Sequence, residues 1–260
     1  MKVAWIGLGQ MGLPTSKKVA AAGHEVRAYD IKSPAADEAE GLILCGSPGE
    51  AAEGCDLLCI AVFSDSQVEE VLTGPDGVMP RLKPGAVVAI FTTGSVESAQ
   101  ALAASAPPGI AVLDTCFSRM WSELSSGMLT LLVGGEAEAI ERCRPAFDAF
   151  AREIFHIGPS GSGRKIKLVN NILFAAHLQV AADGLRLAEG LGLDRARTAS
   201  ALLECSGASD VMRLGQDPGE MLKMVRHYMV KDVGAATDAA ASAGIDLGAL
   251  GDATAGYLKP

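Results

Sequence analysis

The chain has 260 residues, of which 49% are hydrophobic and 20% are charged. A chain of this length and balance folds as one large globular domain or two modest ones, which excludes a disordered protein, a coiled coil and a collagen-like fibre. The formal net charge of -9 argues against a protein that binds nucleic acid or an anionic membrane, since both partners require a basic face.

Cysteine and histidine give no sign of a metal site or of a disulfide framework. The six cysteines include no C-x-x-C pair and the four histidines are scattered, so neither has the spacing of a metal-ligand set. No apolar run approaches the roughly 18 residues of a membrane helix, and the first residues do not resemble a secretion signal. We therefore expect a reduced, soluble, cytoplasmic protein without a bound metal.

The first half of the chain alternates apolar runs of strand length with amphipathic stretches of helical period. The predicted strands are Val3–Ile6, Glu25–Tyr29, Leu57–Phe63, Ala86–Phe91, Ile110–Leu113 and Leu129–Val133. The predicted helices are Met11–Ala22, Gln67–Leu72, Val96–Ala104 and Glu136–Phe150. Mostly continuous apolar runs are typical of strands that are buried on both faces of a parallel sheet. The alternation therefore predicts a doubly wound α/β fold of the Rossmann type.

A glycine-rich segment, residues 158–163, ends this alternation, and no strand pattern follows it. The stretch Arg164–Gly192 predicts one long helix that is apolar nearly all round and therefore buried on most sides. Two further helices are predicted over Asp194–Leu203 and Pro218–Ala243. Because a helical domain of roughly 100 residues cannot cover such a helix alone, we expect a homodimer or a homotetramer.

The first predicted strand continues directly into a full G-x-G-x-x-G sequence that opens a helix. Gly7 permits the tight turn, Gly9 lets the backbone approach a pyrophosphate, and Gly12 allows the helix and the strand to pack closely. The N-terminus of the helix then faces the phosphate charge. We expect a dinucleotide to contact this whole loop, which consists of Gly7, Leu8, Gly9, Gln10, Met11 and Gly12.

Asp30 ends the second predicted strand, at the spacing expected of an acid that accepts hydrogen bonds from both ribose hydroxyls. Its charge would repel a 2′-phosphate, so the preferred cofactor should be NAD. NADP is the less favoured alternative, because Arg27 and Lys32 lie close to Asp30 in sequence and could soften the repulsion. The chain therefore divides into a predicted dinucleotide-binding domain over residues 1–163 and an all-α domain over residues 164–260, for substrate binding and dimerisation.

Four ordered motifs make the chain similar to the β-hydroxyacid dehydrogenases. Residues 7–14, GLGQMGLP, resemble the family's opening G-L-G-x-M-G-x-P. Residues 114–120 with 126–130, DTCFSRM and SGMLT, have the length and frame of its substrate segment D-A-P-V-S-G-G…A-G-T-L-T. Residues 161–171, GSGRKIKLVNN, resemble its catalytic segment G-x-G-x-x-x-K-x-x-N-N, and residues 231–233, KDV, its late K-D-L motif. The resemblance implies a Rossmann-type domain followed by a helical domain, and an oxidoreductase that uses NAD.

Lys167 and Asn171 lie four residues apart in the long predicted helix, so they share one of its faces. A lysine on an otherwise apolar helix is costly unless its ammonium group reaches a cleft or a partner, and burial there lowers its pKa enough for acid–base work near neutral pH. The alternative is a lysine that extends to solvent beside a satisfied asparagine. The resemblance implies that Lys167 is the acid in reduction and the base in oxidation, and that Asn171 orients the reacting oxygen.

The resemblance also implies cofactor contacts at three other places. Thr93 matches the second position of the family's S-T-I-S, which contacts the cofactor. Phe63, Ser64 and Asp65 stand where the family has L-P-D and would line the cofactor by backbone. Lys231 would lie beside the nicotinamide and the substrate. The alternatives are ordinary polar residues at strand ends and an exposed helical lysine.

The chain departs from the family pattern at S-G-G, whose backbone amides hold a substrate carboxylate, and has Ser118, Arg119 and Met120 there. The loss of two glycines restricts a close approach of the backbone, while the guanidinium of Arg119 adds a planar fork that suits an anion. We therefore expect these three residues to hold the anionic end of a small metabolite, whether a carboxylate, a sulfonate or a phosphonate. The alternative is that Arg119 turns outward and pairs with Glu123.

These observations predict an oxidoreductase that interconverts a small β-hydroxy acid and its semialdehyde or keto form by hydride transfer. One alternative is an imine reductase of the same fold. Lys167 argues against it, because imine reductases usually carry another residue at that position. The other alternative is a catalytically silent NAD(P)-binding sensor or scaffold, which the combination of Lys167 and Asn171 disfavours.

Overall fold

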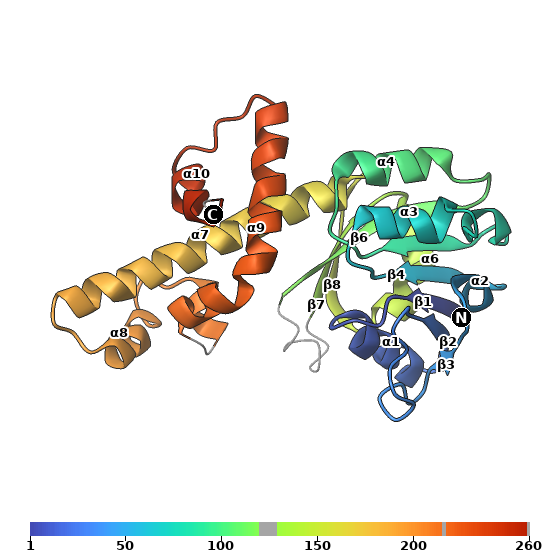
Figure 1. The fold of residues 1–260 in the computed structure, drawn as a ribbon, viewed down its shortest axis with the longest axis horizontal. Coiled ribbons are helices and arrows are strands. Elements are labelled where there is room, and N and C mark those ends of the chain that lie inside the picture. Colours follow the sequence, from blue (N-terminus) through green and yellow to red (C-terminus); the bar gives the residue numbers. More distant parts are fainter. Residues whose placement is uncertain (120–128, 215–216, 259–260) are drawn as a thin grey trace. The chain divides into compact units, whose positions relative to one another are not determined.

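The computed structural model describes residues 1–119, 129–214 and 217–258 (Figure 1). The chain divides into two compact units, Met1–Lys167 and Leu168–Pro260. In the described part of the chain, no helix is both long enough and apolar enough to cross a membrane.

The first unit is built on an eight-stranded sheet with the order β3-β2-β1-β4-β5-β6-β7-β8. The strands are β1 (Lys2–Ile6), β2 (Glu25–Tyr29), β3 (Ile43–Leu44), β4 (Leu57–Ile60), β5 (Val87–Ile90), β6 (Ala111–Ser118), β7 (Leu129–Gly134) and β8 (Ala151–Gly158). The first six strands are parallel, β7 is antiparallel to β6, and β8 is parallel to β7. This topology confirms the predicted Rossmann-type sheet.

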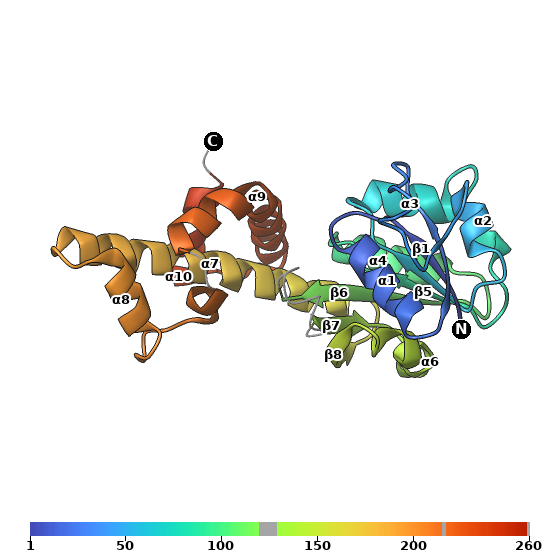
Figure 2. The same cartoon turned by 90° about the horizontal axis from the view of Figure 1, so that it is seen from below.

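Helices cover both faces of this sheet. They are α1 (Gly12–Ala21), α2 (Pro48–Ala52), α3 (Asp65–Thr73), α4 (Val96–Ser105) and α6 (Ala137–Phe147), and a 3-10 turn covers Met79–Arg81. Side chains of α1 and α6 join one apolar core with Trp5 and Leu113, and side chains of α2, α3 and α4 join a second core with Ile6 and Ile90. Figure 2 shows α3 and α6 on opposite sides of the sheet. Because successive strand residues point to opposite faces, continuous apolar strands supply both cores.

The second unit is helical, as predicted. Helix α7 (Ser162–Gly190) begins in the first unit and continues into the second, followed by α8 (Arg195–Leu202), a 3-10 turn (Asp210–Leu214), α9 (Pro218–Ser242), α10 (Ala249–Thr254) and a last 3-10 turn (Ala255–Tyr257). Its core includes Ala175, Val233 and Tyr257, and the Tyr257 hydroxyl donates a hydrogen bond of 3.1 Å to the carbonyl of Ala175. The segment after α9 therefore packs on α7.

The sequence predicted two strands with the wrong bounds and did not predict several other elements. Strands β3 and β8 and helices α2 and α10 were not predicted. β8 is exposed over most of its length at an edge of the sheet, with Phe155 50% exposed, so a search for continuous buried apolar runs misses it. The predicted strand Leu57–Phe63 ends at Ile60, because Ser64 already caps α3. The predicted strand Ile110–Leu113 extends to Ser118, because β6 pairs with β7 over those residues.

The long helix α7 is less buried than predicted. Leu168, Ile172, Leu178 and Leu185 are buried, but Val169, Leu173, Val180 and Leu187 are largely exposed. These four exposed residues fall on one face, because their spacings of four and seven residues bring them back to nearly the same angle around a helix of 3.6 residues per turn. We call Val169, Leu173, Val180 and Leu187 the exposed α7 stripe.

Candidate active site

The predicted cofactor residues of the first unit gather at one edge of the sheet. Strands β1, β2, β4, β5 and β6 are parallel, so their carboxyl ends meet at the same edge. The glycine loop follows β1, Asp30 follows β2, Phe63 and Ser64 follow β4, and Thr93 follows β5. Ser118 is the last residue of β6. Ligands bind at this edge in open α/β sheets, where the strand order reverses.

The three glycines of the loop differ in what a side chain at each position would meet. Gly7 has φ of 97°, and a Cβ there would lie 2.5 Å from the carbonyl oxygen of Ala61. A Cβ at Gly12 would overlap the carbonyl oxygen of Gly7, whereas a Cβ at Gly9 would meet nothing within 4 Å. The fold itself therefore requires Gly7 and Gly12, while the space beside Gly9 is open to a ligand. No described side chain caps the N-terminus of α1 at Met11, so a pyrophosphate fits this place.

Asp30 is held against the glycine loop. Its Oδ2 accepts a hydrogen bond of 2.6 Å from the amide of Leu8, and its Oδ1 accepts one of 2.8 Å from the amide of Lys32. Each carboxylate oxygen can accept a second hydrogen bond, so Asp30 can still receive the ribose hydroxyls. The sequence suggested that Arg27 could offset this charge. In the structure Arg27 instead forms an ion pair with Glu50, at 3.8 Å between Nη2 and Oε1.

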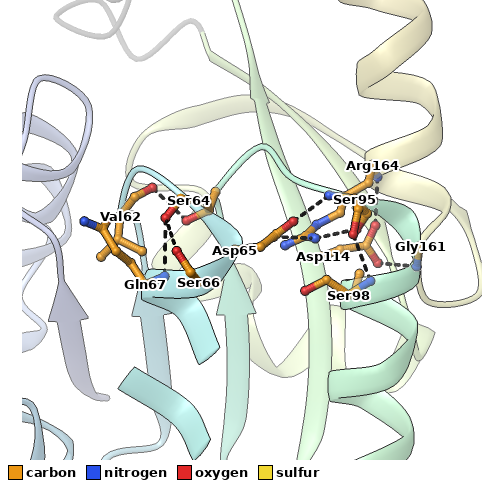
Figure 3. A network of polar contacts seen from close by, with 12 residues as sticks. Val62, Ser64, Asp65, Ser66, Gln67, Ser95, Ser98, Asp114, Gly161 and Arg164 are labelled. Atoms are coloured by element: carbon orange, nitrogen blue, oxygen red, sulfur yellow. Dashed lines mark hydrogen bonds and ion pairs between the residues drawn. The ribbon is translucent and has the colours of Figure 1, made fainter. Parts of the chain in front are cut away.

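The loops after β4 and β5 are held together by their own polar contacts (Figure 3). The Ser64 Oγ accepts the amide of Gln67 at the start of α3, and the Gln67 side chain accepts the amide of Phe63 at 2.9 Å. Thr92 donates a hydrogen bond of 2.9 Å to the carbonyl of Val62 and so joins the two loops. Phe63 is 67% exposed, so its ring can contact a cofactor as well as its backbone.

A buried aspartate, Asp114 on β6, holds the start of α7. It is 1% exposed, and its two carboxylate oxygens accept the amides of Gly161 at 2.7 Å and Arg164 at 2.8 Å. A carboxylate in this position satisfies amides that the helix cannot and complements its dipole. A Cβ at Gly163 would lie 2.5 Å from the carbonyl oxygen of Asp114. The glycines of the catalytic segment therefore let the helix approach β6.

Sequence reasoning did not find the side-chain roles of Asp65, Asp114 and Arg164. The Arg164 side chain is 1% exposed and forms an ion pair of 2.8 Å with Asp65, and its Nη1 also donates to the carbonyl of Ser95 (Figure 3). The available signal was position: Asp114 ends an apolar run, and Asp65 directly follows the predicted cofactor residues Phe63 and Ser64.

Lys167 and Asn171 both lie on α7, in its second and third turns. Lys167 is half-buried. Asn171 is 5% exposed, and its Nδ2 donates a hydrogen bond of 2.8 Å to Oδ2 of Asp232 on α9. Its Oδ1 accepts one of 3.1 Å from Asn170. The amide of Asn171 is thus fixed in orientation within the second unit, and Lys231, next to Asp232, is exposed on α9.

Arg119 has the backbone conformation of a glycine. Its φ is 81°, and it alone among the described non-glycine residues has a positive φ. The S-G-G motif that this segment resembles has glycine here, the residue that adopts a positive φ without strain. Arg119 is exposed and directly follows Ser118. Met120 and Glu123, which the sequence also placed here, lie outside the described residues.

Across the ranges that the structure describes, no group of three or more histidine, cysteine, aspartate or glutamate side chains could hold a metal ion. The open space beside Gly9 and the position of Asp30 after β2 both fit a dinucleotide.

Comparison with known proteins agrees with this geometry. The family model for the NAD-binding domain of 6-phosphogluconate dehydrogenase matches residues 2–158, and the model described as NAD-binding of NADP-dependent 3-hydroxyisobutyrate dehydrogenase matches residues 161–257. The chain is 32% identical to an NAD-dependent L-serine dehydrogenase of Pseudomonas aeruginosa, over 92% of this chain and 85% of that protein. It is 31% identical to a 3-hydroxyisobutyrate dehydrogenase of the same organism, over 82% and 72%.

A solved structure extends the similarity to three dimensions. Mycobacterium tuberculosis 3-hydroxyisobutyrate dehydrogenase with L-serine superimposes with a TM-score of 0.83 at 27% identity. The match covers 98% of this chain and 91% of that one. The predicted order of a Rossmann-type domain and a helical domain is thus shared with a complete known enzyme.

Proposed function

The chain belongs to the β-hydroxyacid dehydrogenase family, and we propose that it oxidises a small β-hydroxy acid, or reduces the corresponding carbonyl compound, with Lys167 as the proton-transfer group. Membership makes it an NAD(P)-dependent dehydrogenase that acts on hydroxyl groups. NAD is its cofactor, and NADP is also compatible with the family.

The nicotinamide supplies hydride transfer when it is bound. The chain's own residues have to bind the cofactor, hold the substrate carbon against it and move one proton. We assign cofactor binding to the glycine loop from Gly7 to Gly12, to Asp30, to Phe63 and Ser64, and to Thr93. The open space beside Gly9 and the hydrogen bond from the Leu8 amide to Asp30 support this assignment.

We assign proton transfer to Lys167. In oxidation its Nζ would accept the proton of the substrate hydroxyl, and in reduction it would return a proton to the developing alkoxide. The observation that supports this assignment is the anchoring of α7: Asp114 of β6, which pairs with Ile90 at the end of β5, accepts the amide of Arg164, one turn before Lys167. The helix that bears the lysine is thus fixed to the edge where the cofactor residues gather.

We assign four further residues to the substrate and its surroundings. Asn171, whose amide Asp232 orients, would hold the reacting oxygen. Ser118 and Arg119 would hold the anionic end. Lys231 would stand near the nicotinamide and the substrate. The relatives named for L-serine and 3-hydroxyisobutyrate both act on small acids with a β-hydroxyl group, so a compound of this class is the proposed substrate.

The two alternative functions are less consistent with these residues. An imine reductase is not expected to keep Lys167, and a silent NAD(P)-binding scaffold has no need of both Lys167 and a buried, oriented Asn171. Turnover separates the three: the proposed enzyme reduces NAD with a hydroxy acid, an imine reductase requires an imine, and a scaffold binds NADH without turnover.

We also propose that the protein is a homodimer or homotetramer in which the exposed α7 stripe is covered by a second copy. Four large aliphatic side chains on one face of a helix form an apolar surface larger than isolated exposed residues do. Light scattering at micromolar concentration should give a multiple of the chain mass. Val180→Glu with Leu187→Glu should lower that mass, and a monomeric wild type would refute the proposal.

The direct test of function is a substrate screen. The protein is mixed with NAD or NADP and with L-serine, 3-hydroxyisobutyrate, or the methyl ester of either acid, and the nicotinamide absorbance is followed. The proposal predicts NAD-dependent turnover of at least one acid and a much lower kcat/KM for its neutral ester. Equal kcat/KM for acid and ester would remove the anionic subsite from the account.

A further inference from the structure

The guanidinium of Arg164 is buried with few partners. Its Nη1 forms an ion pair of 2.8 Å with the carboxylate of Asp65 and donates a hydrogen bond to the carbonyl of Ser95. Its Nε and Nη2 have no hydrogen-bond partner among the residues that the structure describes. A buried, incompletely satisfied arginine is a poor source of stability. Its presence one turn before Lys167 therefore calls for another explanation.

Asp65 connects the arginine to the second cofactor loop. Its Oδ2 accepts a hydrogen bond of 2.7 Å from the amide of Ser95, while its Oδ1 faces Arg164. This approach depends on Gly94, because a Cβ at that position would overlap the Asp65 carboxylate. The family's S-T-I-S has isoleucine where this chain has Gly94. The glycine, the aspartate and the arginine thus belong together.

These contacts join three segments whose relative positions matter for the proposed reaction (Figure 3). Asp65 directly follows Phe63 and Ser64, in the loop after β4. Ser95 closes the loop that holds Thr93, after β5. Arg164 lies in the first turn of α7, and all three residues belong to the first unit.

We propose that Asp65, Gly94 and Arg164 form a latch that sets the position of Lys167 relative to the two cofactor loops, with Arg164 as a positioning residue for proton transfer. The inference rests on the proposed role of Lys167. Its physical basis is that a displacement of about 1 Å between reacting groups can cost 10²-fold in rate. When a dinucleotide binds and orders the cofactor loops, the latch also orders the first turns of α7.

The first test uses hydrogen exchange with NADH as the probe and needs no substrate. In the wild type, NADH should slow amide exchange both in the cofactor loops, residues 63–65 and 93–95, and in the first turns of α7, residues 164–167. In Arg164→Gln, which removes the charge, NADH should still protect the loops but no longer the α7 turns. Equal NADH-dependent protection of α7 in both proteins, or no protection of α7 in the wild type, would overturn the proposal.

The second test uses turnover of 3-hydroxyisobutyrate or L-serine, whichever the wild type oxidises faster. Arg164→Gln should lower kcat about 10–100-fold while the Kd for NADH rises less than tenfold, and Arg164→Lys should recover part of kcat because it restores the charge. The matched control is Arg186→Gln on the same helix, where the arginine is 72% exposed. The control should leave kcat unchanged.

Gly94→Ala tests the latch without changing a charge. Its Cβ displaces the Asp65 carboxylate, so it should lower kcat in the same way, and Gly94→Ala with Arg164→Gln should be no worse than the more severe single variant. Gly184→Ala, whose Cβ would meet nothing within 4 Å, is the control. If Arg164→Gln does not fold, Gly94→Ala still decides.

The proposal is also overturned if Arg164→Gln or Gly94→Ala loses thermal stability while its kcat and the pH profile of kcat stay at the wild-type values, because that result shows a merely structural role. Independent, multiplying losses in the double variant would also overturn it. A failed proposed function gives a different pattern, in which Lys167→Met retains kcat. An inactive Lys167→Met beside a normal Arg164→Gln refutes the latch alone.

Discussion

The amide of Leu8 donates a hydrogen bond of 2.6 Å to Oδ2 of Asp30, so the glycine loop and the carboxylate at the end of β2 are joined directly. In the proposed cofactor site, the charge of Asp30 would repel a 2′-phosphate. We predict that NAD gives a higher kcat/KM than NADP. Asp30→Asn should narrow the gap, because asparagine keeps an acceptor for Leu8 and removes the repulsion.

The measurement is kcat/KM for both cofactors in both proteins. Lys2→Gln, which changes a charge at the far end of β1 from the site, should leave the ratio unchanged. A wild type that prefers NADP would show that this strand end does not select the cofactor.

A second prediction separates the glycines of the loop. Gly9→Ala adds a methyl group to open space, so the melting temperature should stay within about 1–2 °C while the Kd for NADH rises at least about tenfold, an effect of about 1.4 kcal/mol. Gly12→Ala overlaps the carbonyl oxygen of Gly7 and should destabilise the fold itself by about 1–3 kcal/mol. Fluorescence titration and thermal unfolding measure the two effects. Equal losses of stability would contradict the assignment of Gly9 to the ligand.

A third prediction follows from the positive φ of Arg119. Arg119→Gly should stabilise the fold by up to about 1 kcal/mol, because glycine adopts this conformation without strain, whereas Arg119→Ala keeps the strain. Both should lower kcat/KM for an anionic substrate about 10–150-fold, as expected from the loss of a charge-assisted contact of about 1.5–3 kcal/mol. Arg119→Lys should recover part, since an ammonium cannot reproduce the planar fork.

The decisive comparison for Arg119 is between the acid and its methyl ester. The account expects the Arg119 variants to lose activity on the acid and little on the ester. Equal losses on both compounds, or none on either, would show that Arg119 does not recognise the charge.

A fourth prediction concerns acid stability of the second unit. Arg195 holds Asp217 through two hydrogen bonds, of 2.6 and 2.9 Å, and this pairing lowers the pKa of the Asp217 carboxyl. A carboxyl whose pKa is lowered by folding stabilises the fold above its unfolded pKa of about 3.9, and the contribution is lost as the pH falls through the folded pKa. Asp217→Asn keeps the capping oxygen that accepts the amide of Gly219 and removes the charge, together with the second oxygen that accepts a hydrogen bond from Arg195 Nε.

We therefore expect Asp217→Asn to be less stable than wild type at pH 7 by about 1 kcal/mol, a modest value because both side chains are partly exposed. The difference should shrink as the pH falls through 4 toward 3. Urea unfolding at several pH values measures it. Glu220→Gln, which breaks the exposed pair with Lys223, should cost no more than about 0.5 kcal/mol. A difference for Asp217→Asn that is constant with pH would contradict the ion pair.

Local patterns made much of this molecule predictable. The glycine loop and the strand that ends at Asp30 depend on short-range turn and packing requirements, which the sequence displays directly. The position of Lys167 and Asn171 on one helix follows from a single apolar stretch. The sequence could therefore place these residues on their elements, although their chemical roles remain proposals.

Long-range contacts made the rest unpredictable. The burial of Arg164 depends on Asp65 and Ser95, which are distant in sequence, and no local pattern distinguishes it from its exposed neighbour Lys165. Edge strand β8 mixes polar and apolar residues without a strand period, so its pairing with β7 decides its structure. The glycine-like turn at Arg119 is visible only from the backbone, because arginine rarely adopts it.

The measurement that tests the central claim most directly is the turnover of Lys167→Ala beside its affinity for NADH. The account predicts an NADH Kd close to wild type, because none of the proposed cofactor contacts is changed. It predicts a kcat lower by about 10²–10⁴-fold, the usual contribution of a positioned acid or base. A kcat near the wild-type value, with NADH still bound, would show that the proton passes through another residue or through water.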